Sequence, residues 1–371
     1  MAFDKTLKIA SFNCFNLVRP GVIYYDNAAY SEQEFNAKLT WCAALLEQTQ
    51  ADLVGFQEVF SIQALKDLVA RVPHLSGAEV IAPGAEPDLN EKPDEDNPTE
   101  TRAIMPKVGL ATNLPVLEAR EISDFPADAL FSFPRVSPET GEEDFIAIPL
   151  HRFQRPVLKS RVQLANGVPA TVFVAHLKSK RPSYLPGEED DPTPLQNALG
   201  SVRSLLIRSM EAAALRALVL DVVDDPVDGA RGEPVIVLGD LNDSESAVST
   251  RAISGERPWM FAPPDEKKRI WDTLLYNAHE LQAEQSLSGA PFSHIHDGHY
   301  EILDHILLSQ EFYRRFSGNI GEFRSARVFN DHLIDGGQTD DRHGRIVSDH
   351  GVPVAEIKLK PADALNGGAN V

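Results

Sequence analysis

Cysteine is scarce in this chain: Cys14 and Cys42 are the only two among 371 residues. Two thiols cannot make a disulfide framework in a chain of this length, so we expect two small buried hydrophobes in a cytoplasmic protein. Long hydrophobic runs are also absent, and none approaches the roughly 20 residues of a membrane span. The N-terminal segment has no basic stretch followed by an apolar run, so we expect no secretory signal peptide.

Basic residues are few relative to acidic ones. The chain has 35 Lys and Arg residues against 55 Asp and Glu residues, which gives a formal net charge of −20. A protein that grips a nucleic-acid duplex usually carries a basic footprint, because its affinity comes largely from neutralising phosphates. The balance argues against tight, extended nucleic-acid binding but does not exclude a nuclease. Carboxylates are also the ligands that hard metal ions require.

Internal repeats and Gly/Ser-rich linkers are absent too. Short β-rich runs alternate with helical patterns along the whole chain, and the length is sufficient for a sizeable core. We therefore predict a single domain over residues 1–371. Acidic loop insertions are expected near 83–106 and 182–194, where Pro, Asp and Glu occur without periodicity. A short polar tail is expected from about residue 360.

Helices and strands can be placed from the apolar periodicity. Ser31 and Glu34 form a capping box for one helix, and two more helices are predicted at Ser61–Val72 and from about Gln196 to Val222. Two sheets covered by helices fit the order of elements better than a doubly wound sheet, so the fold class is α+β. The predicted strands are Leu7–Asn13, Asp52–Glu58, Val108–Asn113, Phe145–Leu150, Pro156–Leu164, Ala170–His176, Pro234–Gly239, Glu301–Leu308 and Val352–Leu359.

Polar residues follow apolar strands again and again. Strand ends commonly carry ligands and catalytic groups, because a rigid backbone delivers them to a shared cleft. Each residue alone also has a structural explanation, such as a backbone cap or a salt bridge. The residues at these positions are Asn13, Glu58, His176, Asp240 with Asn242, Asp304, and Asp349 with His350.

Three of these positions are informative in their local sequence. Glu58 directly follows an apolar strand, and such a carboxylate is rarely buried without a metal or a salt bridge. His176 is followed by the basic residues Lys178, Lys180 and Arg181, which suit a phosphate substrate but also fit a solvated loop. Asp240 and Asn242 follow a glycine, so they fit either a turn or two side chains aimed at one volume.

Asp304 and His350 suggest an acid–base pair. Asp304 lies inside the apolar run EILDHILLS, where a charged residue needs a partner. His350 precedes the last predicted strand. An Asp that fixes the tautomer of a His, and leaves the other ring nitrogen free to handle a proton, is an arrangement that hydrolases use repeatedly.

Read in chain order, these segments resemble the motif series of the endonuclease/exonuclease/phosphatase superfamily. The segments are FNCFNL, GFQEV, VAHLKS, GDLND, LDHILLS and SDHG. Each motif is weak alone, but six in the same order over residues 7 to 359 are a strong signal. The resemblance implies the deoxyribonuclease-like fold, a four-layer α/β/β/α sandwich of two mainly antiparallel sheets flanked by helices.

The resemblance also implies a metal site. Asn13 and Glu58 would help to hold a divalent metal ion, with Asp349 as a further carboxylate beside it. Ligands that are nearly all oxygen favour Mg²⁺ or Mn²⁺ over zinc. A hard cation offsets the negative charge that builds up when a nucleophile attacks a phosphate ester.

Catalytic roles follow from the same resemblance. Asp240 and Asn242 would line the phosphate and the attacking water, and Asp240 would orient or deprotonate that water. His350 would contact the scissile phosphate or act as acid/base, oriented by Asp304. His176 resembles the second catalytic histidine, which is the general acid in the deoxyribonuclease-like members. We expect Lys178 and Arg155 to contact the substrate phosphate.

The chain departs from the family pattern at two points. The first motif has Cys14 and Phe15 between its two asparagines, one residue more than in many nucleases, so the role of Asn16 stays open. No carboxylate can be assigned as the partner of His176.

A separate histidine-rich segment offers a zinc alternative, although it lacks the HExxH spacing and any CxxC. Its histidines are His294, His296, His299 and His305.

The predicted function is a divalent-metal-dependent phosphodiesterase or nuclease. A phosphomonoesterase or a lipid or inositol-phosphate phosphoesterase on the same fold is the alternative, since substrate choice lies in the loops and the charge of −20 favours it. A calcineurin-like metallophosphatase fits poorly, because the chain lacks an early D-x-H and a GNH[DE] segment. An inactive binding module would have lost site residues, and these are present. We expect a phosphate-ester substrate, possibly nucleic acid, and no obligate protein partner.

Overall fold

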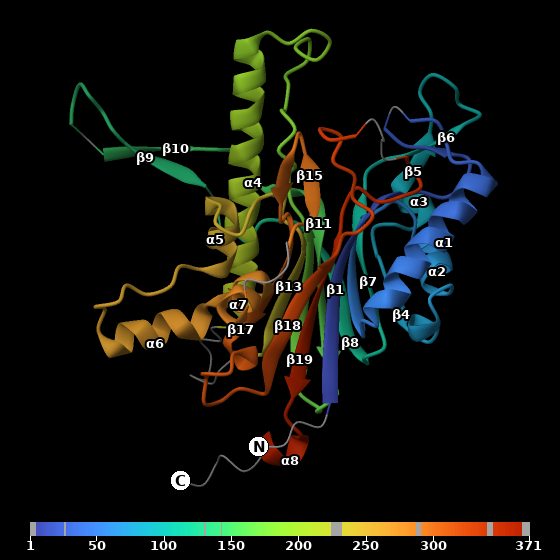
Figure 1. Cartoon of the computed structure of the whole chain (residues 1–371). Coiled ribbons are helices and arrows are strands. Elements are labelled where there is room, and N and C mark those ends of the chain that lie inside the picture. The colour runs from blue at the N-terminus through green and yellow to red at the C-terminus, as the bar shows by residue number, and fades with distance from the viewer. Residues whose placement is uncertain are drawn as a thin grey trace.

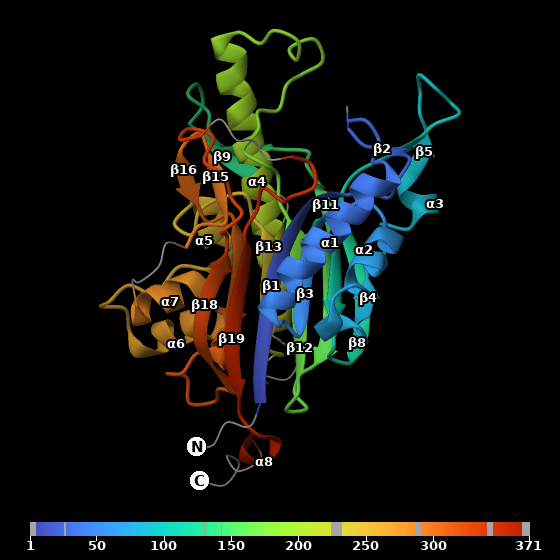
Figure 2. The same cartoon turned by 45° about the vertical axis from the view of Figure 1, so that its right-hand side comes forward.

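A computed structural model describes residues 5–25, 27–129, 131–141, 143–223, 232–286, 291–339 and 344–365. Its two largest sheets stand face to face in the middle of the molecule, with helices on both outer sides (Figure 1). Turning the view by 45° shows the long strands β1 and β19 side by side, with α1 and α2 in front of one sheet (Figure 2).

The first sheet joins the two ends of the chain. Its strand order is β18-β19-β1-β3-β7-β4, and only the central pair β1/β3 is parallel. Because the last long strand pairs with the first, segments from opposite ends of the sequence lie side by side inside one sheet. The strand bounds are β1 Lys5–Leu17, β3 Leu53–Val59, β4 Glu79–Ile81, β7 Lys107–Thr112, β18 Gly321–Phe329 and β19 Val352–Leu359.

The second sheet is built from the middle of the chain. Its order is β14-β17-β13-β12-β11-β8, and again one central pair, β12/β13, is parallel. The two sheets therefore have matching architecture, each with an antiparallel periphery around a parallel pair. The bounds are β8 Val116–Asp124, β11 Arg152–Gln163, β12 Pro169–His176, β13 Val235–Asp240, β14 Leu275–Asn277 and β17 Asp304–Ser309.

Three buried clusters separate four layers. Alternate side chains of a strand point to opposite faces, so Val172 and Val174 pack between the sheets whereas Phe173 packs under α4 (Pro194–Val223). On the other outer face, α1 (Glu32–Thr49) and α2 (Ile62–Val69) cover β1 and β3. The four-layer α+β sandwich predicted from the sequence is confirmed.

The two sheets approach each other closely at Gly55. A Cβ atom on Gly55 of β3 would lie 1.8 Å from Leu238 Cδ1 of β13. Glycine leaves the space that the Leu238 side chain fills. Because of this, β3 of one sheet packs directly against β13 of the other. These are two of the strands whose ends carry predicted site residues.

The segment 83–106 is more ordered than the sequence suggested. It contains α3 (Pro87–Asn90), β5 (Glu91–Pro93) and β6 (Thr101–Ala103), and it forms a small sheet with β2 (Val22–Ile23). The amide of Asn90 is buried and donates to the carbonyl of Phe60 at 2.8 Å. Elements of two to four residues are too short to produce periodicity, so the sequence indicated only an acidic loop insertion here.

Other differences concern exposed elements. The strands β8 and β18 were not predicted, because they are edge strands rich in charged residues. The predicted strand Phe145–Leu150 is shifted to β10 (Glu143–Ala147), which pairs with β9 (Ser132–Val136) in a hairpin. The predicted strand Glu301–Leu308 is divided between β16 (His299–Glu301) and β17.

The remaining elements are short. The segment 182–193, part of the expected insertion at 182–194, contains no helix or strand, and α4 begins at Pro194. The expected tail contains a helical turn, and its residues 366–371 lie outside the described residues.

No helix in the described part of the chain is long and apolar enough to cross a membrane. The other bounds are α5 Val248–Ser254, α6 Pro264–Thr273, α7 Ala278–Gln285, β15 His294–His296, α8 Ala362–Leu365, and 3-10 turns at Pro73–Leu75 and Gln310–Phe312.

Candidate active site

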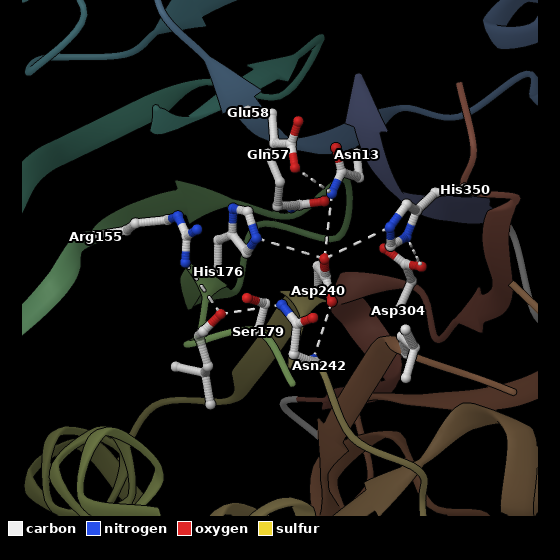
Figure 3. Close-up of polar contacts among 12 residues, drawn as sticks. Asn13, Gln57, Glu58, Arg155, His176, Ser179, Asp240, Asn242, Asp304 and His350 are labelled. Atoms are coloured by element: carbon white, nitrogen blue, oxygen red, sulfur yellow. Dashed lines mark hydrogen bonds and ion pairs between the residues drawn. The ribbon is translucent and has the colours of Figure 1, made fainter. Parts of the chain in front are cut away.

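The predicted site residues meet where the central strands of the two sheets end. In the second sheet, the register pairs His176 with Asp240 and Asp240 with Asp304, so three neighbouring strands present these side chains in one row. Asn13 of the first sheet faces this row, and its Nδ2 donates to Asp240 Oδ2 at 3.1 Å. Figure 3 shows Asp240 at the centre, with Asn13, His176 and His350 around it.

Glu58 is held by β1 through a bulge. The pairing of β1 with β3 shifts after Asn13, and Phe15 and Asn16 adopt positive φ angles of 50° and 64°. This bulge turns the backbone N–H of Asn16 toward Glu58 Oε2, at 2.9 Å, while Asn13 Nδ2 lies 3.3 Å from Glu58 Oε1. Three β1 residues lie between Asn13 and Leu17, whereas only Glu58 lies between their partners on β3, so β1 has two extra residues at this bulge.

Backbone strain is concentrated at this site. Glu58 has a φ of 59° and Asn242 a φ of 55°, in addition to the two bulge residues. Left-handed backbone costs a non-glycine residue of order 1–3 kcal/mol and persists only where the surroundings hold it. Four such residues around one cluster of polar side chains indicate that their positions serve a function.

Asp240 is the last residue of β13, and Asn242 lies in the bend that follows it. Gly239 makes the approach possible, because its φ is 147° and a Cβ atom there would lie 1.9 Å from the carbonyl oxygen of Ala175. The backbone N–H of Asn242 donates to Asp240 Oδ1 at 2.9 Å, and Asn242 Nδ2 donates to the carbonyl of Leu177 at 3.0 Å. Both side chains are therefore fixed by hydrogen bonds.

His350 is oriented by Asp304. Its Nδ1 lies 2.7 Å from Asp304 Oδ2, and its Nε2 lies 3.8 Å from Asp240 Oδ2. Asp304 is completely buried, and its other oxygen, Oδ1, has no hydrogen-bond partner. The predicted Asp304–His350 pair is present, with Nε2 as the ring nitrogen left for chemistry.

Two serines that the sequence analysis did not single out hold this pair in place. Ser348 Oγ donates to the carbonyl of Asn13 at 2.8 Å and accepts from the N–H of His350 at 3.0 Å, so it ties the two ends of the chain together. Ser293 Oγ accepts from the N–H groups of Leu303 and Asp304 at 2.9 and 3.1 Å. Serine gives no distinctive sequence signal, although Ser348 does lie inside the SDHG motif.

His176 faces Asp240 but lacks a second partner. Its Nε2 lies 3.5 Å from Asp240 Oδ2, whereas its Nδ1 is buried without a hydrogen bond. The partner carboxylate that could not be assigned from the sequence is thus not found beside this nitrogen among the described residues.

The electrostatics separate the two histidines. Burial would lower the pKa of His350, but the carboxylates of Asp304 and Asp240 outweigh it and raise this pKa well above its usual value. Burial, with the positive charges of Arg155 and His350, lowers the pKa of His176 well below its usual value. One imidazole is therefore held charged and the other neutral near pH 7.

The carboxylates are destabilised in their charged form. Burial raises the pKa of Asp240 to about 7, and burial together with the charge of Asp349 raises the pKa of Glu58. A divalent cation relieves such crowding, because it favours the ionised carboxylates. Asp240, Asp304 and His350 form one group that could hold a metal ion, and His294, Asp349 and His350 form another. The donors present fit a divalent metal.

The predicted phosphate-binding residues lie at the edge of the cluster. Arg155 Nη1 donates to the carbonyl of Leu177 at 3.3 Å, beside His176 (Figure 3). Lys178 Nζ donates to the carbonyls of Ser179 and Arg181 within its own loop, at 3.3 and 3.1 Å. Contact of either residue with a substrate phosphate stays a prediction.

The histidine-rich segment does not gather into one zinc site. His305 is a buried residue of β17, whose Nδ1 bonds Asn277 Nδ2 and whose Nε2 bonds the carbonyl of Asp243. His296 and His299 pair across the exposed β15–β16 hairpin. Only His294 reaches the cluster, with its ring centroid 4.9 Å from that of His350.

Solved structures with the same fold span the whole chain. The catalytic domain of human nocturnin with a bound sulfate anion is 14% identical, with a TM-score of 0.50 over 96% of this chain and 95% of that one. TDP2 from D. rerio in complex with a single-strand DNA product is 13% identical, with a TM-score of 0.50 over 95% of this chain and 99% of that one. At these identities the similarity shows the fold alone. No curated protein matches the chain.

A family model provides the assignment that these distant structures cannot. It is the model of the Endonuclease/Exonuclease/phosphatase family, and it matches residues 10–350. The match begins in β1 just before Asn13 and ends at His350, so it contains every residue of the cluster. The chain belongs to the endonuclease/exonuclease/phosphatase family.

Proposed function

We propose that this protein is a divalent-metal-dependent phosphodiesterase, a nuclease in the broad sense, that uses Mg²⁺ or Mn²⁺. The observation that supports it is the convergence on Asp240 Oδ2 of three groups from distant parts of the chain: Asn13 at 3.1 Å, His176 at 3.5 Å and His350 at 3.8 Å. A buried carboxylate between an amide and two imidazoles suits activation of water beside a phosphate.

The cation has a defined task and a defined set of ligands in this proposal. Asn13, Glu58 and Asp349 would hold it, and when bound it supplies positive charge that stabilises the pentavalent phosphate. These residues are provided by β1, β3 and the segment before β19, all parts of the first sheet. The second sheet then provides most of the groups that handle protons.

The proton steps follow from the pKa values. Asp240, with a pKa near 7, accepts the proton of the attacking water, and Asn242 positions that water by hydrogen bonding. His350 carries a positive charge and donates a hydrogen bond from Nε2 to a phosphate oxygen. His176 is neutral, so its Nε2–H donates a hydrogen bond to the leaving oxygen, and this oxygen takes its proton from solvent.

The substrate class is the finer part of the proposal. Arg155 and Lys178 are half-buried cations next to His176, and they fit a phosphodiester with groups on both sides of the phosphorus. TDP2 from D. rerio was solved with a single-strand DNA product. A phosphomonoester or a lipid or inositol phosphate is the second candidate, because a net charge of −20 disfavours a long polyanion.

The cytoplasm is the proposed location, since Cys14 and Cys42 are both free.

A substrate panel with a matched variant pair tests the proposal. We expect hydrolysis of an activated phosphodiester that depends on Mg²⁺ or Mn²⁺ and stops with EDTA. The substrate preference is then ranked by comparing the rates on plasmid DNA, single-stranded DNA, RNA, inositol phosphates and phospholipid headgroups. His350→Ala should abolish hydrolysis, whereas His299→Ala, an exposed histidine of the β15–β16 hairpin, should retain it. Near-normal turnover by a folded His350→Ala variant would reject the mechanism.

A further inference from the structure

His294 is a site-facing histidine that the proposed mechanism does not use. It begins β15, and its neighbour Ser293 accepts hydrogen bonds from the N–H groups of Leu303 and Asp304, which hold this end of the hairpin against the site. Its ring lies 4.9 Å from the ring of His350, centroid to centroid. The Nδ1 atom of His294 is buried and has no hydrogen-bond partner. A buried ring nitrogen without a partner is costly unless something binds it.

Asp349 completes a group of three potential ligands. One ligand atom each from His294, Asp349 and His350 can be chosen so that all three lie within 4.8 Å of one another. Two imidazoles and one carboxylate form a donor set with more nitrogen than the oxygen set of Asn13, Glu58 and Asp349. Imidazole suits zinc and similar borderline metals, whereas Mg²⁺ prefers oxygen and keeps several waters.

His350 is also prepared as a zinc ligand by its surroundings. Its Nδ1 is bonded to Asp304 Oδ2 at 2.7 Å, which leaves Nε2 as the nitrogen that can bind a metal. A carboxylate behind a histidine in this way fixes the ring and raises its basicity, and it is the usual support of zinc-binding histidines. Three protein ligands with a fourth position open are typical of non-structural zinc sites.

We propose that His294, Asp349 and His350 form an inhibitory zinc site that overlaps the catalytic site. Zinc bound there occupies His350 Nε2, the nitrogen assigned to the phosphate, and it takes Asp349 away from the magnesium ligands. Binding and catalysis are then mutually exclusive, and zinc competes with the working metal. The binding step follows from the ligand geometry alone, whereas the inhibition rests on the proposed function.

Metal binding can be measured without any enzyme activity. Co²⁺ in a site with imidazole and carboxylate ligands absorbs visible light, so the full chain is titrated with Co²⁺ and then with Zn²⁺ as competitor. We expect one such site in the wild type. His294→Asn should weaken it by about 100-fold or more, because it removes a direct ligand and loss of a mere supporting group already costs 10–100-fold. The matched control, His299→Asn, should bind like the wild type.

Inhibition is then measured with the same three proteins. With Mg²⁺ present, the zinc concentration that halves hydrolysis should rise for His294→Asn by about the same factor, while hydrolysis without zinc is retained. Equal cobalt spectra and affinities for wild type and His294→Asn would overturn the site, whether or not the protein hydrolyses anything. Loss of magnesium-dependent activity in His294→Asn, or activation by zinc in place of magnesium, would overturn the inhibitory role. A protein that binds cobalt through His294 but hydrolyses no phosphate ester would instead count against the proposed function.

Discussion

Asp304 Oδ2 lies 2.7 Å from Nδ1 of His350, although 46 residues separate the two in the chain. The contact is completely buried on the Asp304 side, so solvent does not compete for it. It fixes the proton of the imidazole on Nδ1 and turns Nε2 toward Asp240. The orientation of the principal histidine thus depends on a carboxylate that need not contact the substrate itself.

Asp304→Asn tests that dependence. An amide has the same shape, but it stabilises the imidazolium less and can favour the wrong tautomer, so kcat should fall by about 100-fold to 10,000-fold. The metal concentration for half-maximal activity should change little, because Asp304 is not among the proposed magnesium ligands. Steady-state kinetics with Asp331→Asn, an exposed aspartate, as control will check this. Full activity of the Asp304→Asn variant would mean that His350 needs no orientation.

Glu58→Gln addresses the metal ligand set. Loss of one carboxylate charge from the proposed cation site should raise the Mg²⁺ concentration needed for half activity by about tenfold or more, with a smaller effect on kcat at saturating metal. A metal titration of the initial rate measures this. Glu79→Gln, which changes an exposed glutamate of β4, is the matched control. An unchanged titration would remove Glu58 from the metal site.

Metal affinity should depend on pH near neutrality. Burial raises the pKa of Asp240 to about 7, so its carboxyl group gains a proton as the pH falls through about 7. Asp240 is not one of the proposed ligands, but its charge lies beside Asn13 and Glu58, so its protonation weakens the attraction of the site for a cation. We expect the half-saturating Mg²⁺ concentration to rise by up to about tenfold per pH unit below that point and to level off above it. A titration that is flat between about pH 8 and about pH 6 would show that this carboxyl group does not govern metal affinity.

Gly239→Ala should disturb both stability and activity. The new Cβ atom would meet the carbonyl oxygen of Ala175 at 1.9 Å, and a φ of 147° is unfavourable for alanine. We expect a loss of about 1–3 kcal/mol in the free energy of unfolding and a drop in kcat, because Asp240 is the next residue. Chemical denaturation and kinetics measure the two effects. Gly77→Ala, where nothing lies within 4 Å, should be close to neutral, and equal behaviour of the two variants would contradict the close approach.

The fold could be predicted where burial leaves a periodic pattern. The apolar strands β12 and β13, buried throughout, and the long helix α4 all follow the residue spacing. Prediction failed for β18, where charged residues such as Arg324 and Arg327 hide the alternation at a sheet edge. It also failed for β5 and β6, which have three residues each and are ordered by pairing with each other and, for β6, with the distant β2.

The candidate site was predictable as a set of strand ends, but its geometry was not. Asp304 and His350 could be suspected because both are polar residues in apolar surroundings. The role of Phe15 and Asn16 could not be recognised, because a bulge depends on the register between β1 and β3. Nor could Ser348 be recognised, since its value comes from linking the N–H of His350 to the carbonyl of Asn13.

The pairing of β19 with β1 has a consequence for how the protein is made. Because a ribosome delivers the chain from its N-terminus, β1 must wait for its neighbour β19 until residues 352–359 have been made. A nascent chain that stops short of residue 350 holds Asn13, His176 and Asp240 but lacks the second imidazole, that of His350. The cluster is therefore complete only after residue 350 has been made, and a proteolytic cut just before Ser348 would break the chain that links His350 to Asp304.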